Sequence, residues 1–132
     1  MPILADLHTH STASDGQYTP AQLVGLAKER CLSVLALTDH DTLDGLDEAA
    51  RAGEELGVQV LRGVELGAKE YRSLHILGYG LSPDAPELQA LCGQLREGRD
   101  ERKYRIIGYL REKGVDISLE EVESLAGGEV IA

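Results

Sequence analysis

Short apolar runs alternate with amphipathic segments along the first half of the chain. Three of the runs end in polar turns and predict buried parallel strands, over residues 3–7, 33–37 and 58–64. Between the first two, Thr19 and Gln22 form a capping box and predict a helix over residues 19–30. A second helix is predicted over residues 43–57, with Gly57 as a left-handed cap. The pattern therefore predicts a β-α-β-α-β order and an α/β fold with parallel strands.

The second half of the chain is richer in helical patterns. A fourth strand is predicted over residues 74–79, but it follows the third too closely for a helical crossover, so its direction stays open. Two helices are predicted next, the first starting at Asp84 and the second ending at Gly114. A capping box then opens a short helix at Ser118. Residues 127–132 are typical of a turn that enters a further strand.

Composition places the chain among folded proteins with one domain at most. The sequence has 132 residues, 42% of them hydrophobic, and no Phe or Trp, so the core must be aliphatic. No apolar run approaches the ~20 residues that span a bilayer, and the N-terminus lacks the features of a secretory signal, which predicts a cytoplasmic protein without a membrane helix. Cys31 and Cys92 are then expected to be two buried thiols, with a single disulfide between them as the alternative. The net charge of −10 excludes a nucleic-acid wrapper, so any nucleotide contact must be local.

The four histidines lie at or near predicted strand ends, where α/β folds hold their ligands. His8 and His10 are two residues apart in a strand, so both imidazoles point the same way and can share one ion. With nearby carboxylates they form a set of candidate metal ligands and catalytic residues: His8, His10, Asp15, His40, Glu65 and His75. Imidazole with carboxylate suits Zn, Mn or Fe, with Mg as a further candidate, and this many ligands predicts two or three divalent ions. Taken alone, His75 is more often an ordinary hydrogen-bonded residue, and that alternative stays open.

Four stretches, HTHSTASDG, LTDHDTLDG, GVE and HILGYG, resemble the successive motifs of the PHP superfamily, the polymerase and histidinol phosphatase phosphoesterases. The resemblance covers essentially the whole chain and is greatest for small stand-alone members that act on nucleotides. It implies a distorted (β/α)7 barrel, in which residues 1–83 are the first half, residues 84–126 a helical insertion and residues 127–132 the start of the next strand. The rest of the barrel and the family's later ligands are missing from this sequence, and no histidine follows His75.

The resemblance also implies how the ligands divide among the ions. His8 and His10 would hold the first ion, and Glu65 would join it to a second ion that His75 also holds. Glu65 would thereby fix the spacing of the two ions. A hydroxide bridging them would attack phosphorus in line, without a side-chain nucleophile.

A third ion is implied at Asp15 and His40. Asp6, Asp39 and Asp41 also match motif positions, and we expect them to orient the imidazoles from behind the ligands. The alternative for these three carboxylates is an ordinary role as helix caps or turn residues.

The implied activity is metal-dependent hydrolysis of a small phosphorylated substrate, such as a nucleoside 3′,5′-bisphosphate or a short oligonucleotide. A basic helix face formed by Arg96, Arg99 and Lys103 suits a second phosphate of such a substrate. The alternative is a solvated helix in which Arg96 pairs with Asp100, and Glu101 with Arg105, across one turn.

Two other functions stay open. The chain is alternatively a catalytically incomplete metal-binding or assembly module, since half a barrel leaves an open sheet edge and an apolar face that favour self-association. A hydrolase of the amidohydrolase type would use the HxH pair on carbon centres, but the TDHD and GVE motifs argue against it.

Overall fold

The computed structural model describes residues 2–68 and 73–126, and the elements within them follow the predicted order closely. In chain order they are β1 (Ala5–Thr9), α1 (Pro20–Glu29), β2 (Val34–Leu37), α2 (Leu46–Leu56), β3 (Gln59–Gly67), β4 (His75–Tyr79), α3 (Pro86–Glu112) and α4 (Leu119–Leu125). No helix in these ranges is both long and apolar enough to cross a membrane. The strand predicted at residues 127–132 lies outside the described residues.

The strands form one sheet in the order β1-β2-β3-β4. β1, β2 and β3 are parallel, and β4 runs antiparallel to β3, with Gly67 opposite His75. This settles the direction that the sequence left open, because so short a connection reverses the chain instead of crossing over. His75 therefore begins β4 at the edge where the parallel strands end.

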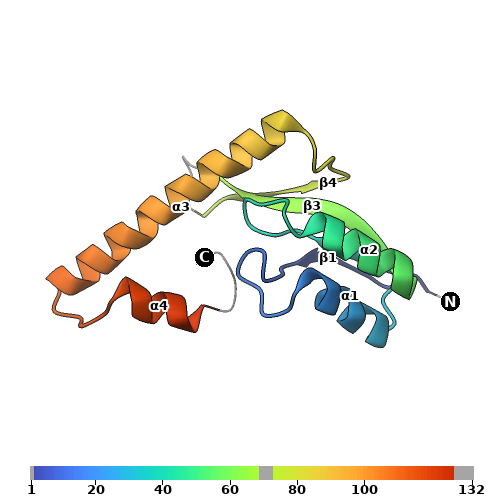
Figure 1. Ribbon diagram of the computed structural model, residues 1–132, viewed down its shortest axis with the longest axis horizontal. Coiled ribbons are helices and arrows are strands. Elements are labelled where there is room, and N and C mark those ends of the chain that lie inside the picture. The colour runs from blue at the N-terminus through green and yellow to red at the C-terminus, as the bar shows by residue number, and fades with distance from the viewer. Residues whose placement is uncertain (1, 69–72, 127–132) are drawn as a thin grey trace.

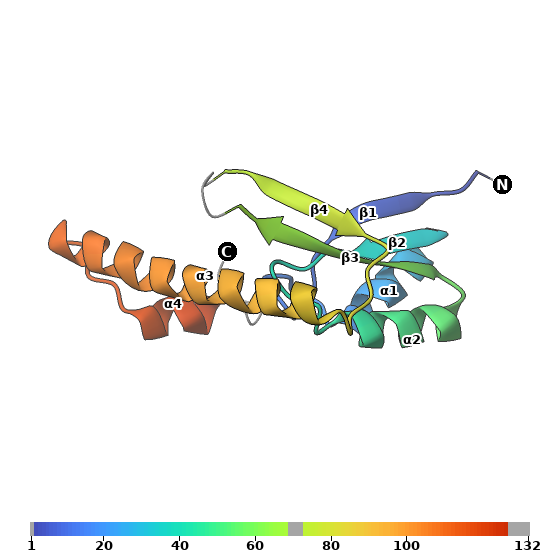
Figure 2. The same cartoon turned by 90° about the horizontal axis from the view of Figure 1, so that it is seen from above.

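Helices α1 and α2 pack on the same face of the sheet (Figures 1 and 2). Thr19 caps α1 through both halves of the predicted capping box, and Gly57 ends α2 in the left-handed conformation, with φ 72°. The core between helices and sheet is aliphatic, as the composition requires, and holds Leu35 and Leu37 of β2 in one buried cluster with Leu46 of α2. This core fixes the strand ends on which the candidate site is built.

The sheet is curled, so that its two edge strands approach each other. The hydroxyl of Tyr79 in β4 donates a hydrogen bond of 2.7 Å to the carbonyl of Leu7 in β1, although β2 and β3 lie between these strands in the sheet order. Figure 2 shows β4 and β1 along the same side of the sheet, opposite α1 and α2. A curled sheet with helices on its outer face agrees with the predicted first half of a barrel.

The structure corrects the helices predicted after the sheet. The two predicted helices are one continuous helix, α3, of 27 residues, because the charged stretch between their apolar parts contains good helix formers and no proline. α3 begins after Ala85, with Pro86 in its first turn, and Asp84 is not its cap. The capping box of Ser118 and Glu121 opens α4 as predicted. Figure 1 shows α3 extending beyond the sheet, with α4 folded back along it.

Both cysteines are free thiols, but only one is buried. Cys92 lies in the core, where burial raises the pKa of its thiol. The prediction of a second buried thiol was wrong, because Cys31 follows directly on the end of α1 and is exposed, with φ 58°.

Candidate metal centre

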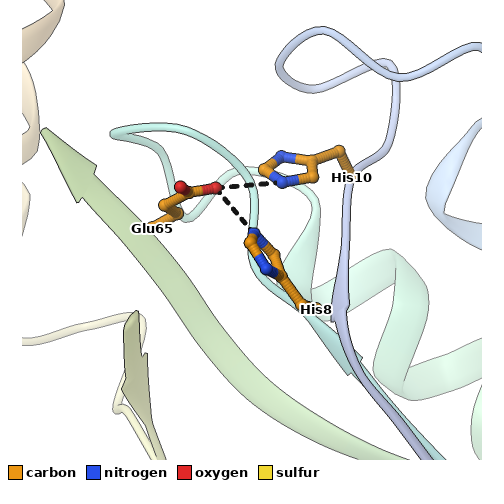
Figure 3. Close-up of side chains that lie close together, drawn as sticks. All are labelled: His8, His10 and Glu65. Carbon is orange, nitrogen blue, oxygen red and sulfur yellow. Dashed lines mark hydrogen bonds and ion pairs between the residues drawn. The ribbon is translucent and has the colours of Figure 1, made fainter. Parts of the chain in front are cut away.

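Histidine side chains converge on Glu65 at the edge where the parallel strands end. Glu65 is buried near the end of β3. Nε2 of His8, in β1, lies 2.8 Å from Oε2 of Glu65, and Nε2 of His10, just after β1, lies 3.0 Å from the same oxygen (Figure 3). One carboxylate oxygen thus faces two imidazole nitrogens, which agrees with the prediction that this histidine pair points the same way.

Two more imidazoles reach the same carboxylate. Nδ1 of His75, at the start of β4, lies 2.7 Å from Oε1 of Glu65. Nδ1 of His40, which follows β2, lies 3.6 Å from Oε2. The antiparallel direction of β4 brings His75 to this edge, so the structure places it with the other candidate ligands.

Asp15 approaches the same cluster from the loop after β1. Its Oδ1 lies 3.5 Å from Nδ1 of His10, and its Oδ2 lies 3.5 Å from Nε2 of His40. Nδ1 of His10 is buried and has no hydrogen-bond partner within the described part of the chain. A buried nitrogen without a partner is costly, and a cation held between it and the facing carboxylate would remove that cost.

The candidate ligands form three overlapping groups, in each of which the ligand atoms lie within 4.8 Å of one another. The groups are His8, His10 and Glu65; His10, Asp15 and His40; and His40, Glu65 and His75. Two ligand atoms on a tetrahedral zinc ion are about 3.4 Å apart, given bond lengths near 2.1 Å. The 3.5 Å separations from Asp15 to the two histidines match that spacing. The cluster therefore fits divalent metal ions.

Burial and hydrogen bonding favour the protonation states that metal ligation needs. Burial by itself raises the pKa of Glu65, but hydrogen bonds from His8 and His75, and the charge of His40 when that ring is protonated at acidic pH, outweigh it. The pKa of Glu65 therefore lies below its ordinary value of 4.5. Desolvation lowers the pKa of His40 below its ordinary value of 6.5, although the charge of Asp15 opposes the shift. At neutral pH Glu65 is thus ionised and His40 neutral, the forms that bind metals.

The three carboxylates expected to orient the imidazoles bind other groups. Asp6 accepts a hydrogen bond from the backbone N–H of His8. Asp39 accepts hydrogen bonds from two serines of the loop after β1. Asp41 accepts one hydrogen bond from an arginine side chain of α3 and one from the backbone N–H of the last residue of β3. The expectation was therefore wrong in its detail, because these side chains hold the segments around the histidines and not the rings. Sequence reasoning missed the serines as partners, since nothing in their spacing points to a residue on another strand.

Arg99 is the predicted basic residue that reaches the cluster. Its Nε donates a hydrogen bond of 2.6 Å to Oδ2 of Asp41, and its Nη2 lies 3.3 Å from Nδ1 of His40. Asp41 is buried and also accepts a hydrogen bond from the N–H of Gly67 at 2.9 Å. These contacts anchor α3 to the edge of the sheet beside the candidate ligands.

Arg96 and Lys103 pair with acidic side chains outside the cluster. Nη1 of Arg96 lies 3.2 Å from Oδ2 of Asp44. Nζ of Lys103 lies 3.0 Å from Asp100 and 3.4 Å from Glu123 of α4. The structure thus brings one of the three predicted substrate-binding residues to the ligands. Lys103 pairs with a carboxylate one turn away, the kind of pair that the alternative expected, whereas Arg96 pairs with Asp44 outside the helix.

A family model for the PHP domain matches residues 6–123. The chain belongs to the PHP domain family. A 5′-3′ exoribonuclease of Haemophilus influenzae is 40% identical to this PHP chain over 126 residues, which are 95% of the chain and 46% of the relative. A 3′,5′-nucleoside bisphosphate phosphatase of Chromobacterium violaceum is 42% identical over 111 residues, which are 83% of the chain and 39% of the relative. The chain thus spans less than half the length of these PHP relatives.

A solved structure shows the same PHP fold. It is a Bifidobacterium adolescentis protein provisionally named a metal-dependent phosphoesterase, which matches with a TM-score of 0.82 and 32% identity. The match covers 92% of this chain and 43% of the other. The predicted fold class, the first part of a PHP barrel, is therefore confirmed.

Proposed function

We propose that this PHP chain is part of a metal-dependent phosphoesterase for a small phosphorylated substrate, such as a nucleoside 3′,5′-bisphosphate or a short oligonucleotide. The observation that carries the proposal is the convergence of four imidazoles on Glu65 at one edge of the sheet. The names of the two relatives, an exoribonuclease and a bisphosphate phosphatase, support a substrate of the nucleotide type.

The clustered side chains are the proposed metal-binding and catalytic residues: His8, His10, Asp15, His40, Glu65 and His75. Zinc, manganese or iron fits this mixed imidazole and carboxylate set, magnesium is a further candidate, and three groups of ligands support two or three ions. Such ions, when bound, lower the pKa of water and neutralise the charge of a phosphate. Glu65 belongs to two of the three groups, so the position of this one side chain affects both proposed ion sites.

The serine hydroxyls near the cluster are poorly placed for covalent catalysis. Ser11 and Ser14 are fully buried, and both hydroxyls donate hydrogen bonds of 2.6 Å to Asp39. A serine nucleophile needs a base within hydrogen-bond reach and access to the substrate. Their surroundings support attack on phosphorus by water, without a serine intermediate.

Arg99 is the proposed phosphate contact beside the cluster. Its Nε and Nη2 face Asp41 and His40, and the planar guanidinium is suited to a phosphate oxygen through its remaining nitrogen. Arg96 and Lys103 stay proposed contacts for a longer substrate, although each would have to exchange an acidic partner for a phosphate.

We also propose a cytoplasmic location and self-association through the sheet edges. Ile76 of β4 is 55% exposed and Leu7 of β1 is 47% exposed. Apolar side chains on edge strands favour pairing with another chain. Sedimentation velocity across a concentration series tests the association, and a monomer at every concentration would contradict it.

A second candidate function is a metal-binding or assembly module without turnover, which would hold ions through the same three ligand groups. The test measures metal content and turnover of a nucleoside 3′,5′-bisphosphate, a short oligoribonucleotide and a generic phosphodiester on one preparation. Nucleotide turnover that stops on chelation supports the phosphoesterase. Bound metal without turnover favours the metal-binding module, and a chain that binds no metal contradicts both the phosphoesterase and the metal-binding module.

A further inference from the structure

Asp39 is the centre of a buried polar network that joins the segment after β1 to the segment after β2. Oδ1 of Asp39 accepts hydrogen bonds from the N–H of Ser11 at 2.7 Å and from the hydroxyl of Ser14 at 2.6 Å. Oδ2 accepts one from the hydroxyl of Ser11 at 2.6 Å. Asp39 is 2% exposed and both serines are completely buried. Hydrogen bonds to an ionised carboxylate are among the strongest in proteins, so the two segments are firmly tied.

The network clamps both ends of the loop that separates two candidate ligands. Ser11 follows His10 directly, and Ser14 directly precedes Asp15. The carbonyl of Ser11 accepts hydrogen bonds from the N–H groups of Ser14 at 3.0 Å and Gly16 at 2.8 Å. A Cβ atom on Gly16 would overlap the carbonyl oxygen of His10. The loop is therefore closely packed, and its conformation determines where Asp15 lies.

Asp39 also directly precedes His40, which is the third member of the ligand group that contains His10 and Asp15. The Asp39 carboxylate thus holds the residues that stand next to His10 and Asp15 in the sequence, and Asp39 itself leads directly into His40. We propose, resting on the function proposed above, that Asp39 is a positioning residue that builds this ion site. The two groups that contain Glu65 depend on the Asp39 side chain less, because neither of them includes Asp15 and its clamped loop.

Cadmium-113 NMR of the full chain tests the proposal, since each occupied site gives its own resonance. Asp15→Ala removes a ligand of this group alone and so identifies its resonance. Asp39→Ala is expected to lose the same resonance and keep the others. Asp39→Asn is expected to retain it, because an amide can accept from Ser11 N–H and the Ser14 hydroxyl and donate to the Ser11 hydroxyl. Asp44→Ala, an exposed carboxylate in the same segment, is the matched control and should keep every resonance.

A resonance that survives in Asp39→Ala, or that is lost equally in Asp39→Asn, would overturn the positioning role. If Asp39→Ala does not fold, Ser14→Ala removes the hydrogen bond of 2.6 Å to Asp39, together with a longer one of 3.4 Å to Asp15, and should weaken cadmium binding at this site on the order of tenfold. Equal affinity of Ser14→Ala and wild type would again overturn it. A wild-type chain without any cadmium resonance contradicts the proposed function itself, so the two failures are distinguishable.

Discussion

The Arg99→Ala substitution is expected to destabilise the chain strongly, because it leaves a buried carboxylate without its partner. Nε of Arg99 lies 2.6 Å from Oδ2 of Asp41, and the two side chains are 16% and 1% exposed. Removing one partner of a buried ion pair costs about 3 to 5 kcal/mol. Asp41 keeps its hydrogen bond from the N–H of Gly67, which puts the expected loss of unfolding free energy at the lower end, about 3 kcal/mol.

Arg96 supplies a matched control on the same helix. Arg96 and its partner Asp44 are 41% and 67% exposed, so Arg96→Ala is expected to cost at most about 1 kcal/mol. With a urea slope of about 2 kcal/mol per molar, Arg99→Ala should lower the unfolding midpoint by about 1.5 M and Arg96→Ala by at most about 0.5 M. Equal midpoints for the two variants would refute the conclusion that Asp41 depends on Arg99.

A double variant separates the buried charge from lost packing. Asn tolerates the left-handed backbone of Asp41, at φ 50°, and keeps an acceptor for the N–H of Gly67. Adding Asp41→Asn to Arg99→Ala should therefore restore at least about 1 kcal/mol of unfolding free energy. A double variant no more stable than Arg99→Ala would show that the uncompensated charge is not the cause.

Three further predictions concern the metal centre. His8→Ala is expected to abolish phosphoesterase turnover and lower metal content, and unchanged turnover would contradict its role as a ligand. Zinc at about 100 times its Kd should raise the unfolding free energy by about 2.7 kcal/mol relative to chelated protein, and equal urea midpoints would mean that the folded chain binds none. In metal-free protein, unfolding free energy should fall as the pH drops below 4.5, because the pKa of Glu65 is lower in the folded chain. Glu65→Gln should flatten this dependence, and an identical pH profile would show that another group causes it.

Local signals in the sequence were enough to predict the starts of α1 and α4 and most of the ligand cluster. The capping boxes at Thr19 and Ser118 involve residues three apart, and both are present in the structure. The convergence of His8, His40 and Glu65 was predictable because parallel strands end at one edge of a sheet. These predictions needed only short-range spacing and strand order.

Contacts between distant segments were not predictable from the single chain. Whether His75 reaches the cluster depends on the direction of β4, which the length of its connection left open. The pair of Arg99 and Asp41 joins residues 58 apart, and the hydrogen bonds of Asp39 join residues 25 to 28 apart. Periodicity and capping rules carry no information on such pairs. The continuity of α3 was missed for a related reason, since its charged middle has no apolar repeat to mark it as helical.

The number of ions bound per chain tests the metal centre most directly. The wild-type chain, equilibrated with zinc or manganese, freed of excess ions and analysed by mass spectrometry of the metal, is expected to retain two or three ions. Glu65→Gln alters the carboxylate shared by two of the three ligand groups and should retain at least one ion fewer. A wild-type chain that retains none, or a Glu65→Gln chain that retains as many as wild type, would contradict a metal centre built around Glu65.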